Sequence, residues 1–373
     1  MKLPSILLLV LIAATAARAD FTPTFDGAFG GAYAGNSEEE GALSRARMRF
    51  GAASGLAFGV KAEAAWEGNV FLADEEVLPL AANPRERLGD PPLELSRGRN
   101  YIFRENLDRL YLAWERSSWN LTLGRQAVGH GSGRFFNPGD IFAPQNPGRL
   151  WSEYKSGIDA ARLYSTVGEK SGFGALLAAH REGGRRAYYL VQGRTNVFDA
   201  VDLSGYGGMT LGAPTAALDV AFDLYGAGLY ADSVCRFDRE FPKGFRSAVG
   251  VHGRVLPDLD AIAEYHFNGP GGAEKKSYPG TLFSEEAENG EIFVLGKNYA
   301  VLGLDWQAHP LVSAGMRALA NLGDSSATTY FNISWSASDY VTVVLGGSAG
   351  RGPGGSEFSG APDTVFAEAR LNL

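Results

Sequence analysis

The chain of 373 residues carries 34 lysines and arginines against 42 aspartates and glutamates, whereas a nucleic-acid partner would call for a clustered basic surplus. The formal net charge is −8, and a single cysteine, Cys235, excludes an intrachain disulfide. Without a C-x-x-C-H sequence the chain has no motif for attaching a c-type haem, and we predict no cofactor.

Residues 1–19 have the pattern of a cleavable export signal. Lys2 gives the positive start, residues 6–17 are almost wholly apolar, and Ala17-Arg18-Ala19 is a small-x-small cleavage site. The apolar stretch is shorter than the about 20 residues that a membrane-spanning helix needs. We therefore expect an exported protein that begins at Asp20, with a retained anchor helix as the alternative.

The rest of the chain alternates apolar and polar residues with a period of two, to its last segment. There one face carries Val, Ala and Leu, while Glu368 and Arg370 share the other. Successive residues of a strand point to opposite faces, so each segment has one apolar and one polar face. More than a dozen such segments, without helical periodicity between them, are typical of a closed antiparallel transmembrane β-barrel.

The connections between these segments alternate between minimal turns and long polar stretches. The long ones lie near 69–102, 129–156 and 269–296 and are expected outside the cell, because outer-membrane barrels have short periplasmic turns. Strands can be counted inward from each end of residues 20–373, with every long connection placed on the outer side. The two counts are consistent with each other only if 185–236 holds four strands. The fold prediction is therefore a single all-β barrel of about 18 strands, or about 16 if two merge.

A soluble β-sandwich or β-helix would also alternate, with its apolar face inside. Aromatic residues near predicted strand ends, such as Trp66, Trp119, Trp306 and Trp335, favour the membrane barrel, because interfacial girdles place them there. In this orientation apolar faces meet lipid and charged faces meet the lumen. The residues predicted to face lipid are Val251, Phe331, Val343 and Leu371, and those predicted to face the lumen are Arg47, Arg109, Arg246 and Glu368.

Charges on the polar faces suggest a basic wall in the N-terminal half of the barrel. Arg45, Arg47 and Arg49 share one face, and Arg109 and Arg162 follow on later segments. These charges either neutralise one another inside a plugged barrel or line an aqueous pore, in which rings of charge set ion selectivity. A barrel of this size is wide enough for a water channel, which favours the pore.

The most distinctive local sequence is LGRQ at 123–126, followed by GHGSGRFFNPGDIFAP at 129–144. Over 110–150 the chain resembles porin-like outer-membrane barrels, including alginate-export-type porins. The resemblance implies a passive channel and transfers no site residue.

The same segment combines Gly and Pro with four apolar side chains, Phe135, Phe136, Ile141 and Phe142. Prolines exclude a central strand, and such apolar side chains are out of place on an exposed loop tip. We expect it to fold inward and narrow the lumen; packing on the rim or at a subunit contact is the alternative. The residues predicted to line the pore or its constriction are Arg45, Arg47, Arg49, Arg109, Arg134, Asp140, Arg149, Glu153 and Arg162.

An enzyme is not expected. A G-x-S-x-G nucleophile turn would need glycine where His130 stands, and the five histidines lack metal-ligand spacing. We predict an outer-membrane channel for passive diffusion of small, hydrophilic, anionic solutes. The alternative is a barrel sheath of a transenvelope complex, such as a porin–cytochrome electron conduit. Expected partners are membrane lipid and lipopolysaccharide, small solutes, the barrel-assembly machinery, and other copies in a homotrimer or a partner cytochrome.

Overall fold

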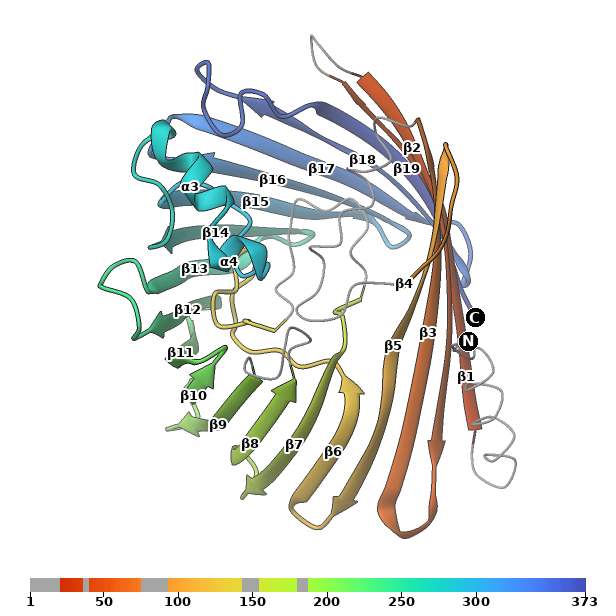
Figure 1. Cartoon of the computed structure of the whole chain (residues 1–373), viewed down its shortest axis with the longest axis vertical. Coiled ribbons are helices and arrows are strands. Elements are labelled where there is room, and N and C mark those ends of the chain that lie inside the picture. The colour runs from red at the N-terminus through yellow and green to blue at the C-terminus, as the bar shows by residue number, and fades with distance from the viewer. Residues whose placement is uncertain (1–20, 36–39, 75–92, 143–153, 180–186) are drawn as a thin grey trace.

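The computed structural model describes residues 21–35, 40–74, 93–142, 154–179 and 187–373, and most of them lie in antiparallel β-strands (Figure 1). The predicted export signal and the predicted pore residues Arg149 and Glu153 lie outside the described residues. The strands are β1 (Phe21–Gly35), β2 (Glu40–Gly55), β3 (Val60–Ala73), β4 (Leu93–Arg97), β5 (Tyr101–Arg116), β6 (Trp119–Gln126), β7 (Ile158–Val167), β8 (Ser171–Ala179), β9 (Ala187–Val197), β10 (Val201–Thr210), β11 (Ala213–Leu224), β12 (Ala227–Arg236), β13 (Phe245–Leu256), β14 (Leu259–Asn268), β15 (Asn298–His309), β16 (Val312–Asn321), β17 (Ser326–Ser336), β18 (Val341–Arg351) and β19 (Asp363–Asn372).

The sheet closes on itself through β1, in which Phe29 lies opposite Ala46 of β2 and Ala369 of β19. β3 pairs directly with β5, and the short β4 pairs with β5 within the same connection. The closed ring therefore contains 18 strands, as predicted, and the alternative of 16 is wrong. The stretch 185–236 holds the four strands β9 to β12 that the count required.

Most short turns lie at one end of the barrel, where β1 begins and β19 ends. Two tight turns show why the hairpins close as they do; Tyr225-Gly226, between β11 and β12, lies at this end, and Leu211-Gly212, between β10 and β11, lies at the opposite end. Leu211-Gly212 and Tyr225-Gly226 each have two successive positive φ angles, 52° and 86° in the first and 51° and 84° in the second. This geometry matches the right-handed twist of antiparallel strands, and glycine adopts it without steric cost.

The connection between β14 and β15 contains the helices α3 (Tyr278–Leu282) and α4 (Glu285–Glu288), which lie at the barrel rim opposite the short turns (Figure 1). Within the described residues, no helix combines the length and the apolar character that crossing a membrane would demand.

The two faces of the strands separate as the alternation predicts. Val251 and Phe331 are 40% and 47% exposed on the outer surface, whereas Arg47, Arg246 and Glu368 are buried on the inner face. The strands thus present apolar side chains outward and charged side chains inward. A soluble sandwich with an apolar core would have the reverse arrangement.

One of the aromatic residues expected at an interface is buried instead. Trp66 donates a hydrogen bond of 3.0 Å from Nε1 to Glu105, next to a β-bulge between Ala65 and Trp66. The exposed aromatic side chains nearer the short turns include Trp119, Trp306 and Trp335.

Candidate functional site

The chain that leaves β6 runs into the barrel interior rather than away from it (Figure 1). We call residues 128–142 the constriction loop. Ile141 and Phe142 are buried against Leu176 and Tyr188 of β8 and β9, in a cluster that also includes residues of β7, β10 and β12. Each buried side chain of this size contributes about 1.5–3 kcal/mol.

A second apolar contact fixes the other part of the loop. Phe135 and Phe136 are buried with Tyr299 and Val301 of β15. The ring of Phe136 stacks on Phe293 from the connection that carries α3 and α4, with 5.7 Å between ring centroids. The loop thus crosses from one side of the inner wall to the other, and its apolar side chains explain why it lies inside.

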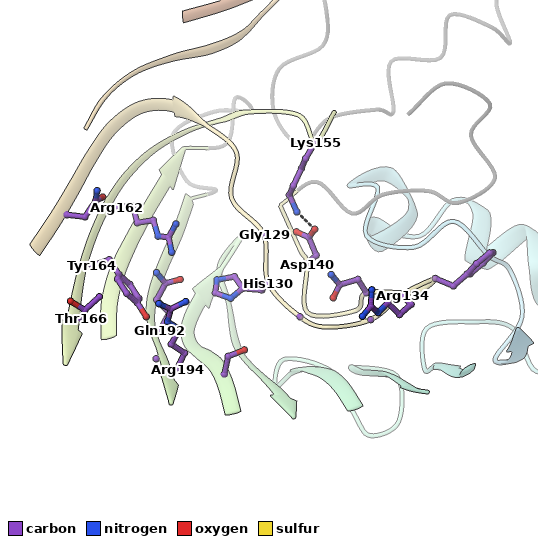
Figure 2. A pocket seen from close by; sticks show the side chains of 17 residues that line it. Gly129, His130, Arg134, Asp140, Lys155, Arg162, Tyr164, Thr166, Gln192 and Arg194 are labelled. Carbon is purple, nitrogen blue, oxygen red and sulfur yellow. Dashed lines mark hydrogen bonds and ion pairs between the residues drawn. The ribbon is translucent and has the colours of Figure 1, made fainter. Parts of the chain in front are cut away.

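A cavity of about 780 Å³ lies beside the constriction loop (Figure 2). Its strand-borne lining includes Arg162 and Tyr164 of β7 and Gln192 and Arg194 of β9, and the loop contributes His130. The guanidinium carbons of Arg162 and Arg194 lie 5.4 and 5.6 Å from the centroid of the Tyr164 ring. Within the described residues neither arginine forms an ion pair with a carboxylate, so their charge is not cancelled locally.

The remaining charged groups of the cavity are Arg134, Asp140 and Lys155. Lys155 is ion-paired with the buried Asp140, which removes both from the local charge balance. Arg134 is exposed and extends to β13, where its Nη2 lies 3.0 Å from Nε2 of His252. With the Lys155–Asp140 pair set aside, the charged groups that remain are Arg134, Arg162 and Arg194, so the net charge of the cavity lining is positive.

The imidazole of His130 adds no charge to the cavity at neutral pH. Burial, together with the positive charges of Arg162 and Lys155, lowers the pKa of His130 from 6.5 to about 4. Its ring packs on Tyr206 of β10, with 4.9 Å between centroids. The cavity therefore gains the His130 charge only in acid.

The predicted basic wall of β2 is differently arranged. Arg47 Nη2 donates to Asp26 over 2.8 Å, Arg49 Nη2 lies 3.0 Å from Asp108, and Arg45 donates to Asn69 over 2.6 Å. The ring of Tyr154 covers two of them, 5.2 Å from the guanidinium carbon of Arg47 and 4.3 Å from that of Arg49. Carboxylates of β1, β3 and β5 therefore offset most of the charge that the sequence suggested for this wall.

Arg109 belongs to the same buried network, because its Nη1 lies 2.7 Å from Asp108 and its Nη2 donates to the carbonyl of Lys155. Of the predicted pore residues, the structure gathers Arg134, Asp140 and Arg162 at the cavity and places Arg45, Arg47, Arg49 and Arg109 on the paired wall. The structure does not place Arg134 and Asp140 against the arginines of β2, because Arg134 contacts His252 of β13 and Asp140 is paired with Lys155.

Sequence reasoning missed Arg194 and Lys155. Arg194 lies in the stretch 185–236, where strand boundaries were ambiguous, so its face could not be assigned. Gln192 and Arg194 do alternate with Val191 and Gly193, and that spacing was the available signal.

Three acidic residues at the rim, Glu285, Glu286 and Glu291, are paired with arginines, which weakens their repulsion of anions. Arg246 Nη2 lies 2.6 Å from Glu291, and Arg239 Nη2 lies 3.0 Å from Glu285 and 3.5 Å from Glu286. Among the described residues, no group of three His, Cys, Asp or Glu side chains is placed to bind a metal ion.

At the level of sequence, no family model and no curated protein matches the chain. Solved structures are similar over nearly the whole length. OccK5 (OpdH) of Pseudomonas aeruginosa has a TM-score of 0.59 at 12% identity, covering 95% of this chain and 98% of its own. OccAB1 of Acinetobacter baumannii has a TM-score of 0.58 at 10% identity, covering 96% and 98%.

OprD of Pseudomonas aeruginosa has a TM-score of 0.57 at 10% identity, covering 94% of this chain and 95% of its own. At this level of sequence identity, structural similarity is evidence for the fold alone. The resemblance to alginate-export-type porins stays a prediction. The chain has a porin-like fold, that of a closed antiparallel barrel of 18 strands.

Proposed function

We propose that the chain forms a channel in the bacterial outer membrane through which small hydrophilic solutes diffuse passively, with a preference for anions. The observation that carries this proposal is the cavity beside the constriction loop, where Arg162 and Arg194 have no carboxylate partner among the described residues. Charged side chains that line a narrow part of a pore set its ion selectivity. The porin-like fold supports the same reading.

The expected preference is modest and depends on salt. The screening length falls from about 30 Å at 0.01 M salt to about 3 Å at 1 M, so the field of the arginines reaches across the pore only in dilute solution. Pairing of the rim carboxylates with Arg236, Arg239 and Arg246 also weakens the competing negative field at the mouth.

The orientation in the membrane follows from the turns. Outer-membrane barrels place short turns in the periplasm and long connections outside, which assigns the end with α3 and α4 to the cell surface. The apolar outer face would contact lipid and lipopolysaccharide. The export signal, the assembly machinery and a homotrimer remain predictions.

The sheath of an electron conduit is less favoured by the packing of the interior. Such a sheath needs an open lumen for a multihaem partner, whereas here the constriction loop occupies the interior and is buried on two sides.

Purified full-length protein in planar lipid bilayers tests the proposal. We expect stepwise ion conductance, and a reversal potential across a gradient of potassium chloride that indicates anion preference at low salt. Folded protein that inserts without conducting would refute the channel. A cation preference that persists after Glu285→Gln and Glu286→Gln would refute the anion selectivity.

A further inference from the structure

The middle of the constriction loop is held by carboxylates of the inner wall. Ser132 donates its backbone amide to Asp219 of β11 over 2.8 Å, and its hydroxyl donates to the same carboxylate. Gly139 donates its amide to Asp232 of β12, also over 2.8 Å. Both carboxylates are buried, at 9% and 1% exposure, so water cannot readily replace these donors.

Glu264 of β14 accepts three successive backbone amides of the loop. Its Oε2 accepts from Arg134 and Phe135 over 3.2 and 3.1 Å, and its Oε1 accepts from Phe136 over 2.8 Å. Tyr230 donates its hydroxyl to the same carboxylate. Hydrogen bonds to an ionised acceptor are about twice as strong as neutral ones, so an ionised Glu264 holds the loop more tightly than a protonated one.

The glycines of the loop allow its backbone to approach the wall this closely. A Cβ atom on Gly139 would lie 2.5 Å from Oδ1 of Asp232, and one on Gly131 would lie 2.6 Å from Oδ2 of the same residue. Gly131 also has φ +86°, a conformation that other residues rarely adopt. The Gly-rich sequence is therefore matched to the position of Asp232.

We propose that Asp219, Asp232 and Glu264 are the positioning residues of the constriction loop, and that their ionisation sets the width of the pore. The inference about width rests on the proposed channel function. A protonated carboxyl group accepts backbone hydrogen bonds more weakly than a carboxylate does. Acid therefore loosens the middle of the loop, while the apolar contacts of Phe136 and Phe142 keep it within the barrel.

Other charged and titratable groups surround these carboxylates. The loop contributes His130, Arg134 and Asp140. The surrounding segments contribute Lys155, Tyr206, Tyr230, Arg246, His252, His266 and Glu291. Because His130 stays neutral down to a pH of about 4, it contributes little above that value.

A cross-link between loop and wall measures the position of the loop without relying on conductance. The full-length protein would carry Arg134→Cys and His252→Cys, whose native side chains lie 3.0 Å apart, in a Cys235→Ser background. A short bifunctional maleimide then reports the docked loop. We expect the yield at pH 7 to fall about tenfold when Asp219→Asn, Asp232→Asn and Glu264→Gln are combined, since charged hydrogen bonds are lost.

The cysteine-pair protein with its three carboxylates intact should give a lower cross-linking yield when it is brought from pH 7 to pH 4 before the reaction. Over the same change of pH, the single-channel conductance of the protein without the cysteine pair should rise. In the triple variant both quantities should stay constant over this range.

The matched control is Asp260→Asn, on the same strand and face as Glu264 and paired with Arg254 at 3.6 Å. It should behave as the parent does. Because maleimide reacts with thiolate, a single-cysteine variant calibrates the reaction rate at each pH.

Equal yields and equal pH profiles in the parent and the folded triple variant would overturn the proposal. If the triple variant does not fold, Gly139→Ala replaces it and should lower the yield through the clash with Asp232. Its control is Gly280→Ala, because a Cβ at Gly280 has open space. If the triple variant loses the cross-link but the parent protein never conducts, the positioning role of the three carboxylates is upheld and the channel function is refuted.

Discussion

On the wall formed by β1, β2, β3 and β5, Arg47 lies 2.8 Å from Asp26 of β1 and Arg49 lies 3.0 Å from Asp108 of β5. On β7 and β9, Arg162 and Arg194 contact the ring of Tyr164 and no carboxylate in the part of the chain that the structure describes. The first set holds neighbouring strands together, and the second leaves a net field in the cavity. The number of arginines on a face therefore does not measure its field, because selectivity depends on charge that remains unpaired.

The largest expected change is in single-channel conductance, and it should come from removing the constriction loop. Deleting 132–140 and joining the ends with a short Gly-Ser linker should raise single-channel conductance severalfold, because this loop crosses the lumen. Barrel assembly should survive, since loops tolerate change better than strands. The control removes Pro353–Gly355, an exposed part of the β18–β19 connection. Unchanged conductance in the folded deletion would place the loop outside the permeation path.

Loss of one arginine should destabilise the protein more when it comes from the paired wall at β2 than when it comes from the cavity wall of β7 and β9. Arg47→Gln removes the cation that lies 2.8 Å from the buried carboxylate of Asp26 and should lower the free energy of unfolding by about 3 kcal/mol. Arg194→Gln removes an exposed side chain without an ion pair among the described residues and should cost less than about 0.5 kcal/mol. Urea titration of the refolded proteins in lipid measures both. Equal losses would remove the distinction between the walls.

A smaller effect concerns pH. The unfolded chain protonates His130 near its ordinary pKa of 6.5, and the folded protein does so only at about 4. The unfolded state therefore binds more protons between these values, and the His130 contribution to stability falls as pH drops from 6.5 to 4. His130→Gln should flatten this part of the pH–stability curve, and His309→Gln, at the exposed end of β15, should not. Identical curves for the parent and His130→Gln would contradict the burial of this ring.

The period-two pattern allowed the strands and their faces to be predicted, because side-chain direction follows directly from strand geometry. The inward course of the loop could be predicted from Phe135, Phe136, Ile141 and Phe142, which need apolar partners. The pairing of the wall arginines could not be predicted.

One reason is local and physical. Asp108 and Arg109 are consecutive, and strict alternation would point them to opposite faces. The bulge at this point leaves Asp108 as an extra residue opposite the step from Ala65 to Trp66, and both side chains reach the interior. Asp108 thereby comes within 3.0 Å of Arg49, a contact between strands that no spacing in the sequence indicates.

Reversal potentials of two double variants test most directly whether the unpaired arginines produce the selectivity. Arg162→Gln with Arg194→Gln should abolish most of the anion preference of the purified channel at low salt. Arg45→Gln with Arg49→Gln removes the same formal charge from the paired wall and, in folded protein, should change the preference much less. The opposite ranking, with selectivity lost only in the β2 variant, would contradict the assignment of the field to the cavity beside the constriction loop.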